Sequence, residues 1–142
     1  MKSLLTVILT FLLMSLSSWG IESDEAIQAF DDLYKNIEQE IIFIDDKREK
    51  VHQLAEENLN AKAVLLTEIA EYYKRAGEYC SNTINKVSPA NTEEGIAIMQ
   101  RDIRFFQSKE AEFRQHANHI IAAIEYKDTM DFWYTYLYCM QF

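Results

Sequence analysis

The sequence predicts an all-α protein: an antiparallel three-helix, coiled-coil-like bundle with a short C-terminal fourth helix or tail, after a cleaved N-terminal signal peptide. Two observations point to helices. Apolar residues recur at alternating spacings of three and four, which places them on one side of a helix. The chain also holds only three glycines and one proline, whereas all-β folds use many of both in tight turns. The third observation concerns export and lies in the first 20 residues.

Those first 20 residues have the three parts of a secretory signal. Lys2 precedes an apolar run from Leu4 to Leu16, and small residues, Ser18 and Gly20, occupy the −3 and −1 positions of a cleavage site. The run is shorter than the ~20 residues that a membrane-spanning helix needs, so an uncleaved anchor is the less favoured alternative. We therefore expect a signal peptide over residues 1–20 and one helical-bundle domain over residues 21–142, located in the periplasm or outside the cell.

The charge of the chain restricts its partners. Acidic residues number 23 against 14 basic ones, a net of −9, and loss of Lys2 with the signal makes it −10. Nucleic acids bind to basic surfaces, so we expect no nucleic-acid partner. Self-repulsion that keeps the chain soluble is the simplest interpretation of this charge, and a basic partner is the alternative.

The first helix is predicted over about residues 24–57. Ser23 can cap it, and acidic Asp24 and Glu25 suit its first turn. Its apolar stripe, at positions a and d of a heptad, comprises Ile27, Phe30, Tyr34, Ile37, Ile41 and Ile44.

The second helix is predicted over about residues 61–87. The stripe turns polar around residues 57–60, which we interpret as a reversal between two helices, although one long continuous helix is the alternative there because the gap has no Gly or Pro. The stripe resumes with Leu65, Ile69, Tyr72, Ala76 and Tyr79. Pro89 then stops the helix, because proline disfavours helix in the residue before it.

The third helix is predicted over about residues 92–127. Asn91 can cap it, and Asp128-Thr129 provides a new cap that would start a separate C-terminal segment over residues 129–142. The stripe of this helix comprises Ile96, Met99, Ile103, Phe106, Glu110, Phe113, Ala117, Ile120 and Ile124. Antiparallel packing buries the three stripes; a homodimer that shares them is the competing arrangement. After removal of the signal we expect no transmembrane segment.

The two cysteines, Cys80 and Cys139, form a candidate disulfide, because exported chains meet an oxidising compartment. An intermolecular bond and free thiols are the alternatives. A straight helical C-terminus would carry Cys139 away from Cys80, so an internal bond and such a helix are hard to reconcile.

Three histidines and two carboxylates form a candidate metal site: His52, Glu56, Glu112, His116 and His119. Spacings of three and four bring members on one helix to the same side, and imidazole with carboxylate suits zinc or copper. At ~1.5 Å per residue, the histidines of the first and third helices fall at about the same level. Solvated surface histidines are the simpler interpretation, so no cofactor is expected unless this site binds zinc or copper.

The C-terminal segment is rich in aromatic residues and has no charged side chain after Asp131. Aromatic side chains of this kind are common both in cores and at interfaces. The candidate interaction surface comprises Phe132, Trp133, Tyr134, Tyr136, Tyr138 and Phe142.

Catalytic motifs with a recognisable mechanism do not occur in the sequence, so no catalytic residue is assigned. We therefore expect an exported, non-enzymatic protein that binds another protein as chaperone, adaptor or inhibitor. A small-ligand or metal carrier and an enzyme of another type are the alternatives.

Overall fold

The computed structural model describes residues 24–56, 58–87 and 93–140, and the side chains of these residues except 94, 95 and 132–140. The predicted signal peptide, at residues 1–20, lies outside the described residues. So do Ser23, at the predicted start of the first helix, and the turn around Pro89.

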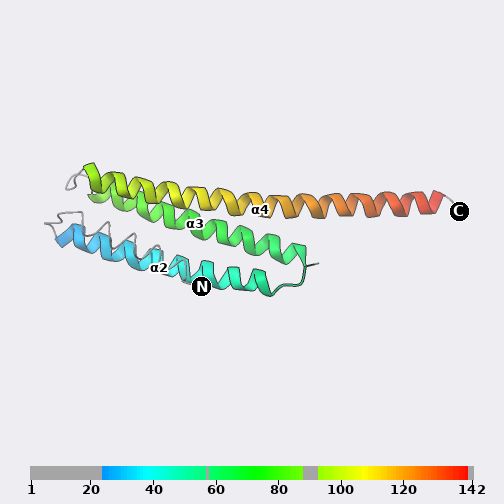
Figure 1. Cartoon of the computed structure of the whole chain (residues 1–142), viewed down its shortest axis with the longest axis horizontal. Coiled ribbons are helices and arrows are strands. Elements are labelled where there is room, and N and C mark those ends of the chain that lie inside the picture. The colour runs from blue at the N-terminus through cyan, green and yellow to red at the C-terminus, as the bar shows by residue number, and fades with distance from the viewer. Residues whose placement is uncertain (1–23, 57, 88–92, 141–142) are drawn as a thin grey trace.

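Three helices make up the described chain: α2 (Asp24–Gln53), α3 (Leu59–Val87) and α4 (Glu93–Met140). They run alternately in opposite directions, and α3 packs against both α2 and α4 (Figure 1). The charged residues at the two ends of α2 interact favourably with the helix dipole: Asp24 and Glu25 lie in its first turn, and Lys50 and His52 lie in its last. The predicted all-α, antiparallel three-helix bundle is confirmed.

The reversal between α2 and α3 confirms that the polar gap separates two helices. The Asn58 amide donates to the Ala55 carbonyl at 3.1 Å, and the Asn58 carbonyl accepts from Lys62 at 3.2 Å as α3 begins. At the described residues of this reversal, 54–56 and 58, no positive φ occurs. The alternative of one continuous helix is therefore wrong.

The predicted separation of a C-terminal segment at Asp128-Thr129 is also wrong, because α4 continues without interruption to Met140. The Thr129 hydroxyl donates to the Glu125 carbonyl at 2.8 Å. Threonine makes this bond to the carbonyl four residues back inside helices, whereas a capping hydroxyl accepts from an amide ahead of it.

The core follows the predicted stripes closely in α4 and less closely in α2. In α4, Met99, Phe106 and Ala117 are buried and the rest of the stripe is partly buried. In α2, Ile27 is 47% exposed, while Ala26 and Leu33, one position before the predicted a sites, are buried. A straight helix has 3.6 residues per turn, so a stripe chosen at 3.5 drifts around it.

The third helix is much longer than the other two. Glu71 on α3 pairs with Arg114 on α4, and antiparallel helices advance equally, so Leu59 lies level with about Tyr126. Beyond that level α4 projects past the α2–α3 hairpin (Figure 1) by about 14 residues, or ~21 Å. Within the described part of the chain, no helix is both long enough and apolar enough to cross a membrane.

Candidate functional site

The predicted metal-site residues share a level but do not form a cluster. Arg48 on α2 lies near enough to Glu112 on α4 to contribute to lowering its pKa, although the main cause is the hydrogen bond from Lys109 at 2.7 Å. His52 and His116 each follow four residues further along these two parallel helices. The predicted coincidence of levels therefore agrees with the structure.

Within the described part of the chain, these side chains do not come together as a group of metal ligands. His52, His116 and His119 are all exposed, as is Glu56, and the His116 ring lies edge-on to Phe113 at 6.4 Å between centroids. Among the described residues, no three His, Cys, Asp or Glu side chains come close enough together to hold a metal ion. The structure thus gives no support to zinc or copper binding at this level.

Cys80 is a free thiol buried in the core, 1% exposed. Burial raises its pKa to about 12, and the charge of Asp102 adds to this. Gly77 on the same helix contacts Phe106 of α4, so Cys80 lies level with about residue 103. The backbone of Cys139 is then about 50 Å further along a straight helix, far beyond the ~7 Å between Cα atoms that a disulfide allows. The structure does not support the predicted Cys80–Cys139 bond.

The predicted aromatic interaction surface is described only by its backbone. Phe132, Trp133, Tyr134, Tyr136 and Tyr138 belong to the helical backbone of α4, but their side chains, like all of Phe142, lie outside the described part of the structure. Their helical positions place them on the projecting end of α4.

Interhelical ion pairs fix the register of α3 against both neighbours. Toward α2, Arg75 Nε donates to both carboxylate oxygens of the buried Glu40, at 3.1 and 3.2 Å. Lys47 Nζ lies 2.6 Å from Glu68 Oε2. Toward α4, Arg114 pairs with Glu71 and thereby lowers the pKa of that carboxyl. Exposed pairs such as Glu71–Arg114 contribute little stability. Glu40 is buried and depends on Arg75 to compensate its charge.

A small aromatic stack lies on the α2–α3 seam. The rings of Phe43 and Tyr72 stack at 5.3 Å with a 28° angle, and the Arg75 guanidinium lies 4.6 Å above the Tyr72 ring. Such a cation–π contact holds an arginine in place while its polar edge stays in water. Phe43 nevertheless remains 40% exposed.

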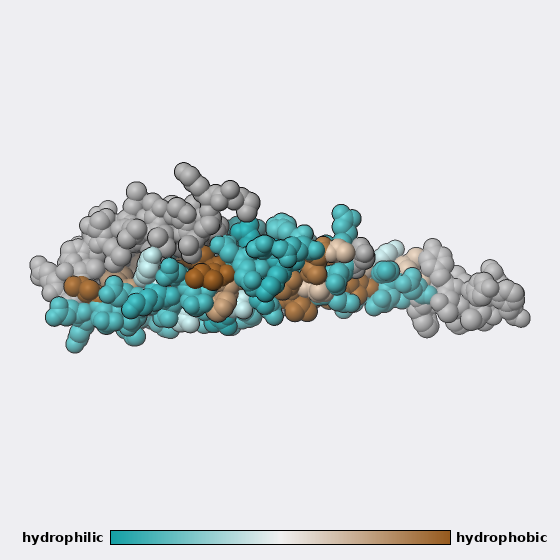
Figure 2. Space-filling model, turned by 90° about the horizontal axis from the view of Figure 1, so that it is seen from below, coloured by the Kyte–Doolittle hydropathy of each residue, from teal (hydrophilic) through white to brown (hydrophobic). Residues whose placement is uncertain are grey.

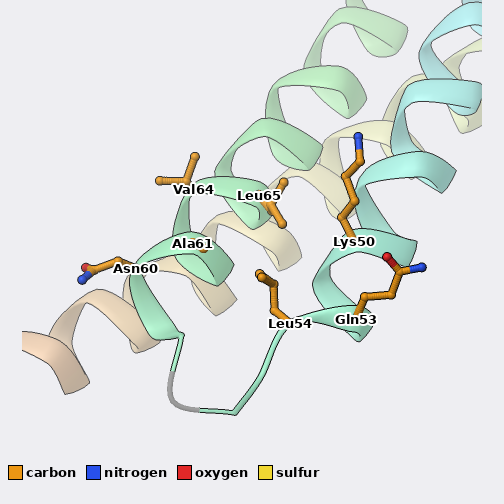
Figure 3. Close-up of a pocket in the computed structure, with 7 residues that line it drawn as sticks. All are labelled: Lys50, Gln53, Leu54, Asn60, Ala61, Val64 and Leu65. Atoms are coloured by element: carbon orange, nitrogen blue, oxygen red, sulfur yellow. The ribbon is translucent and has the colours of Figure 1, made fainter.

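The end of the same seam, next to the reversal, forms an apolar groove of about 520 Å³, which we call the hairpin groove. Figure 3 shows Lys50 and Gln53 on α2, and Val64 and Asn60 extending from α3 on the side away from α2, with α4 passing behind. Leu54 and Leu65 point toward the space between the two helices, and Val64 is 58% exposed. The lining comprises Lys50, Gln53, Leu54, Asn60, Ala61, Val64 and Leu65.

Most of the described surface around such apolar positions is hydrophilic. Figure 2 shows one long face on which brown apolar patches are separated by charged and polar residues. A groove that is apolar inside and polar at its rim, here through Lys50, Gln53 and Asn60, therefore stands out from this surface and has the composition of a contact site.

The hairpin groove was not predicted from the sequence. The sequence feature that could have indicated the groove is the run Ala63-Val64-Leu65-Leu66. This run has more apolar residues than one helical stripe can bury. Val64 lies outside the stripe that faces the core, so the excess apolar residue indicates an exposed contact.

The chain matches no protein-family model, no curated protein and no solved structure.

Proposed function

We propose that this chain is an exported, non-enzymatic helical bundle that binds another protein, in the manner of a chaperone, adaptor or inhibitor. The hairpin groove carries this proposal, because it is an open, mostly apolar hollow that an apolar side chain of a partner can contact. The export part rests on the first 20 residues and their resemblance in composition to a signal peptide.

The groove suits an apolar side chain of a partner. Leu54, Val64 and Leu65 offer apolar contact, and burial contributes roughly 25 cal/mol for each Å² removed from water. Lys50 at the rim already pairs with Asp46 at 2.7 Å, which holds its chain beside the groove. A suitable partner would place an apolar side chain against the three apolar residues of the groove and a carboxylate next to Lys50.

The ion pairs along α3 make this surface suitable for recognition. The buried core that includes Ile44 and Ile69 holds the two helices together, and the Glu40–Arg75 and Lys47–Glu68 pairs join them as well, so the groove exists before a partner arrives. A preformed site avoids part of the ordering cost of binding.

The test is affinity capture from the native envelope fraction, followed by a measured dissociation constant for the captured protein. Val64→Lys places a charge in the groove, and we expect at least about a tenfold weaker affinity, equivalent to ~1.4 kcal/mol. Asn82→Lys adds the same charge at an exposed position of α3 and is expected to bind as the unmodified chain does.

Circular dichroism establishes that both variants retain their helix content. Equal binding by all three proteins would exclude the groove as the binding site. Failure to recover any partner that depends on Val64 would reject the proposed function itself.

A further inference from the structure

A second, smaller hollow of about 270 Å³ lies on α3, next to the hairpin groove. Its lining begins at Thr67, three residues after Val64 of the hairpin groove. Residues 64, 68, 71 and 75 are spaced by four, three and four, so they follow one another along one side of α3. A partner that extends from the hairpin groove along α3 would contact this hollow next. The lining comprises Thr67, Glu68, Glu71, Tyr72 and Arg75.

The second hollow contains two carboxylates, whereas the hairpin groove is mostly apolar. Lys47 binds Glu68 through Oε2, and Arg114 binds Glu71 through Oε1. The other oxygen of each carboxylate has no hydrogen-bond partner among the described residues, and the two side chains are 41% and 44% exposed. Each carboxylate oxygen accepts up to two hydrogen bonds, so both remain available to a donor from outside the chain.

The positive charges around the second hollow are compensated within the chain. Arg75 Nε donates to both oxygens of Glu40, and the guanidinium lies over the Tyr72 ring. Lys47 and Arg114 each bind a carboxylate as well. The net charge of the chain, −9, adds a general attraction for positively charged partners. The chemical complement of this hollow is therefore a basic group.

The polar side chains beside the two hollows favour a helical partner over an extended one. The Thr67 hydroxyl donates to the Ala63 carbonyl at 2.9 Å, and the Gln53 amide donates to Glu49 at 3.0 Å. Since these donors are used within the chain, an extended partner would place backbone N–H and C=O groups against this surface without partners for them, which is costly. A helix satisfies its own backbone and needs only side-chain contacts.

We propose, building on the function proposed above, that the occupant of the hairpin groove is an amphipathic helix of a basic partner protein, and that it places a lysine or arginine in the second hollow. Val64 lies about 8 Å along α3 from the point midway between Glu68 and Glu71. Residues four and seven apart on one side of a helix are separated by ~6 and ~10.5 Å. The basic residue of the partner is therefore one or two turns from its apolar anchor.

The first test uses three synthetic peptides of ~18 residues, long enough to cover the ~22 Å from Asn60 to Arg75. In one, leucine and lysine follow the helical spacing of three and four. In another, the same residues alternate one by one, which favours a strand. The third has helical spacing with glutamate in place of lysine. Fluorescence anisotropy with the full chain is expected to show binding of the helical lysine peptide, and at least about tenfold weaker binding of the other two.

Two variants test whether the helical lysine peptide occupies both hollows. Val64→Lys places a charge in the hairpin groove, and Thr67→Lys places one in the second hollow, where it competes for Glu68 and Glu71. Each is expected to weaken binding at least about tenfold. Asn82→Lys adds the same charge at an exposed position of α3 outside both hollows and is expected to bind within about twofold of the unmodified chain. Circular dichroism checks that all variants retain their helix content.

The opposite results would overturn the proposal. No binding of the helical lysine peptide up to ~1 mM excludes it. Equal binding of the alternating peptide indicates an extended partner, and equal binding of the glutamate peptide excludes a basic one. An equal loss in Asn82→Lys indicates general attraction to an acidic chain. A chain mass that doubles in light scattering, and does so only when Val64 is present, assigns the groove to a second copy.

The proposed function and this proposal fail in different ways. A captured partner whose binding depends on Val64 but not on Thr67 leaves the hairpin groove as a binding site and rejects the helix that spans both hollows. A captured partner that depends on neither residue rejects the hairpin groove itself.

Discussion

At the scale of single residues, Asp102 is the least favourably placed charge that the structure describes on α4. Its side chain is 17% exposed and lies 3.5 Å from the guanidinium of its neighbour Arg101. Burial raises the pKa of its carboxyl, and Arg101 offsets this only in part. The buried Cys80 thiol lies close enough for the Asp102 charge to raise its pKa further.

Asp102→Asn is therefore expected to stabilise the bundle at pH 7. A carboxyl whose pKa is higher in the folded than in the unfolded state binds more protons when folded, so its contribution to stability falls as pH rises. The cost is present while the carboxyl is ionised in the folded state, declines as pH falls through the raised folded pKa, and is absent below the unfolded value of about 3.8. Urea unfolding of variant and parent between pH 7 and pH 4 measures the difference.

Asp31→Asn is the matched control, because it removes the same charge from an exposed position of α2. The change in stability of Asp31→Asn therefore measures only the effect of lowering the net negative charge of the chain by one. If Asp102→Asn gained no more stability than Asp31→Asn at pH 7, desolvation of Asp102 would not be significant.

Residue chemistry was the part least accessible from the sequence. The spacing of His52 and His116 predicted a common level, which the structure reproduces, because level depends only on helix rise. The structure also agrees with the simpler interpretation of solvated surface histidines, because both rings are exposed. The Cys80–Cys139 pairing was predicted from the compartment, and the conflict with a straight helical C-terminus was recognised from the sequence; the structure decides for the straight helix.

At the scale of elements, α3 is the helix that organises the bundle, since it packs against both neighbours. Small residues line its close approach to α4: Ala76 and Gly77 are buried, and a Cβ added at Gly77 would lie 3.5 Å from the Cβ of Phe106. That distance is an ordinary van der Waals contact, and Gly77 has no positive φ. Glycine is therefore required here neither by space nor by backbone conformation.

Gly77→Ala is expected to stabilise the protein by about 0.5–1 kcal/mol, the difference in helix propensity between the two residues in a helix interior. The free energy of urea unfolding measures it. Ala76→Gly, at the adjacent buried position, provides the reverse change and is expected to destabilise by at least as much. A loss of stability in Gly77→Ala would mean that α3 and α4 approach more closely than the structure indicates.

The elements themselves were largely predictable, and their ends were predicted where proline or polar runs interrupt the stripe. The stripe of α4 was placed correctly from Ile96 to Ile124, because its apolar residues are distinct from their charged neighbours. The start of α2 was less clear, since Ile27 and Leu33 are both apolar and only packing selects between them. Thr129 has the sequence of a cap and the structure of a helix interior, which local sequence alone does not separate.

At the scale of the whole molecule, the chain divides into a packed part and a projecting part. The packed part holds the buried residues of α2 and α3 and the first half of α4. The projecting part is a single helix that extends the line of α4 beyond the reversal between α2 and α3 (Figure 1). The sequence predicted the core of the packed part and the unusual composition of the projecting part. It did not predict that one helix, α4, runs through both.

Deletion of residues 132–142 is expected to leave the bundle folded, with a free energy of unfolding within about 1 kcal/mol of the parent, because no hairpin residue lies level with that segment. Chemical unfolding is measured at several protein concentrations, so that any contribution from self-association is detected. A loss of several kcal/mol would instead place the deleted segment in the core of the same chain.

The length of α4 also determines how the molecule moves in solution. Its 48 residues extend about 72 Å, whereas a compact chain of 142 residues, with a radius of gyration of about 15 Å, is only about 40 Å across. A rod of these proportions tumbles slowly about its short axes and sweeps a larger volume than a sphere of equal mass. It therefore elutes from a sizing column ahead of globular standards even as a monomer, and its oligomeric state has to be determined by scattering or sedimentation rather than by elution volume.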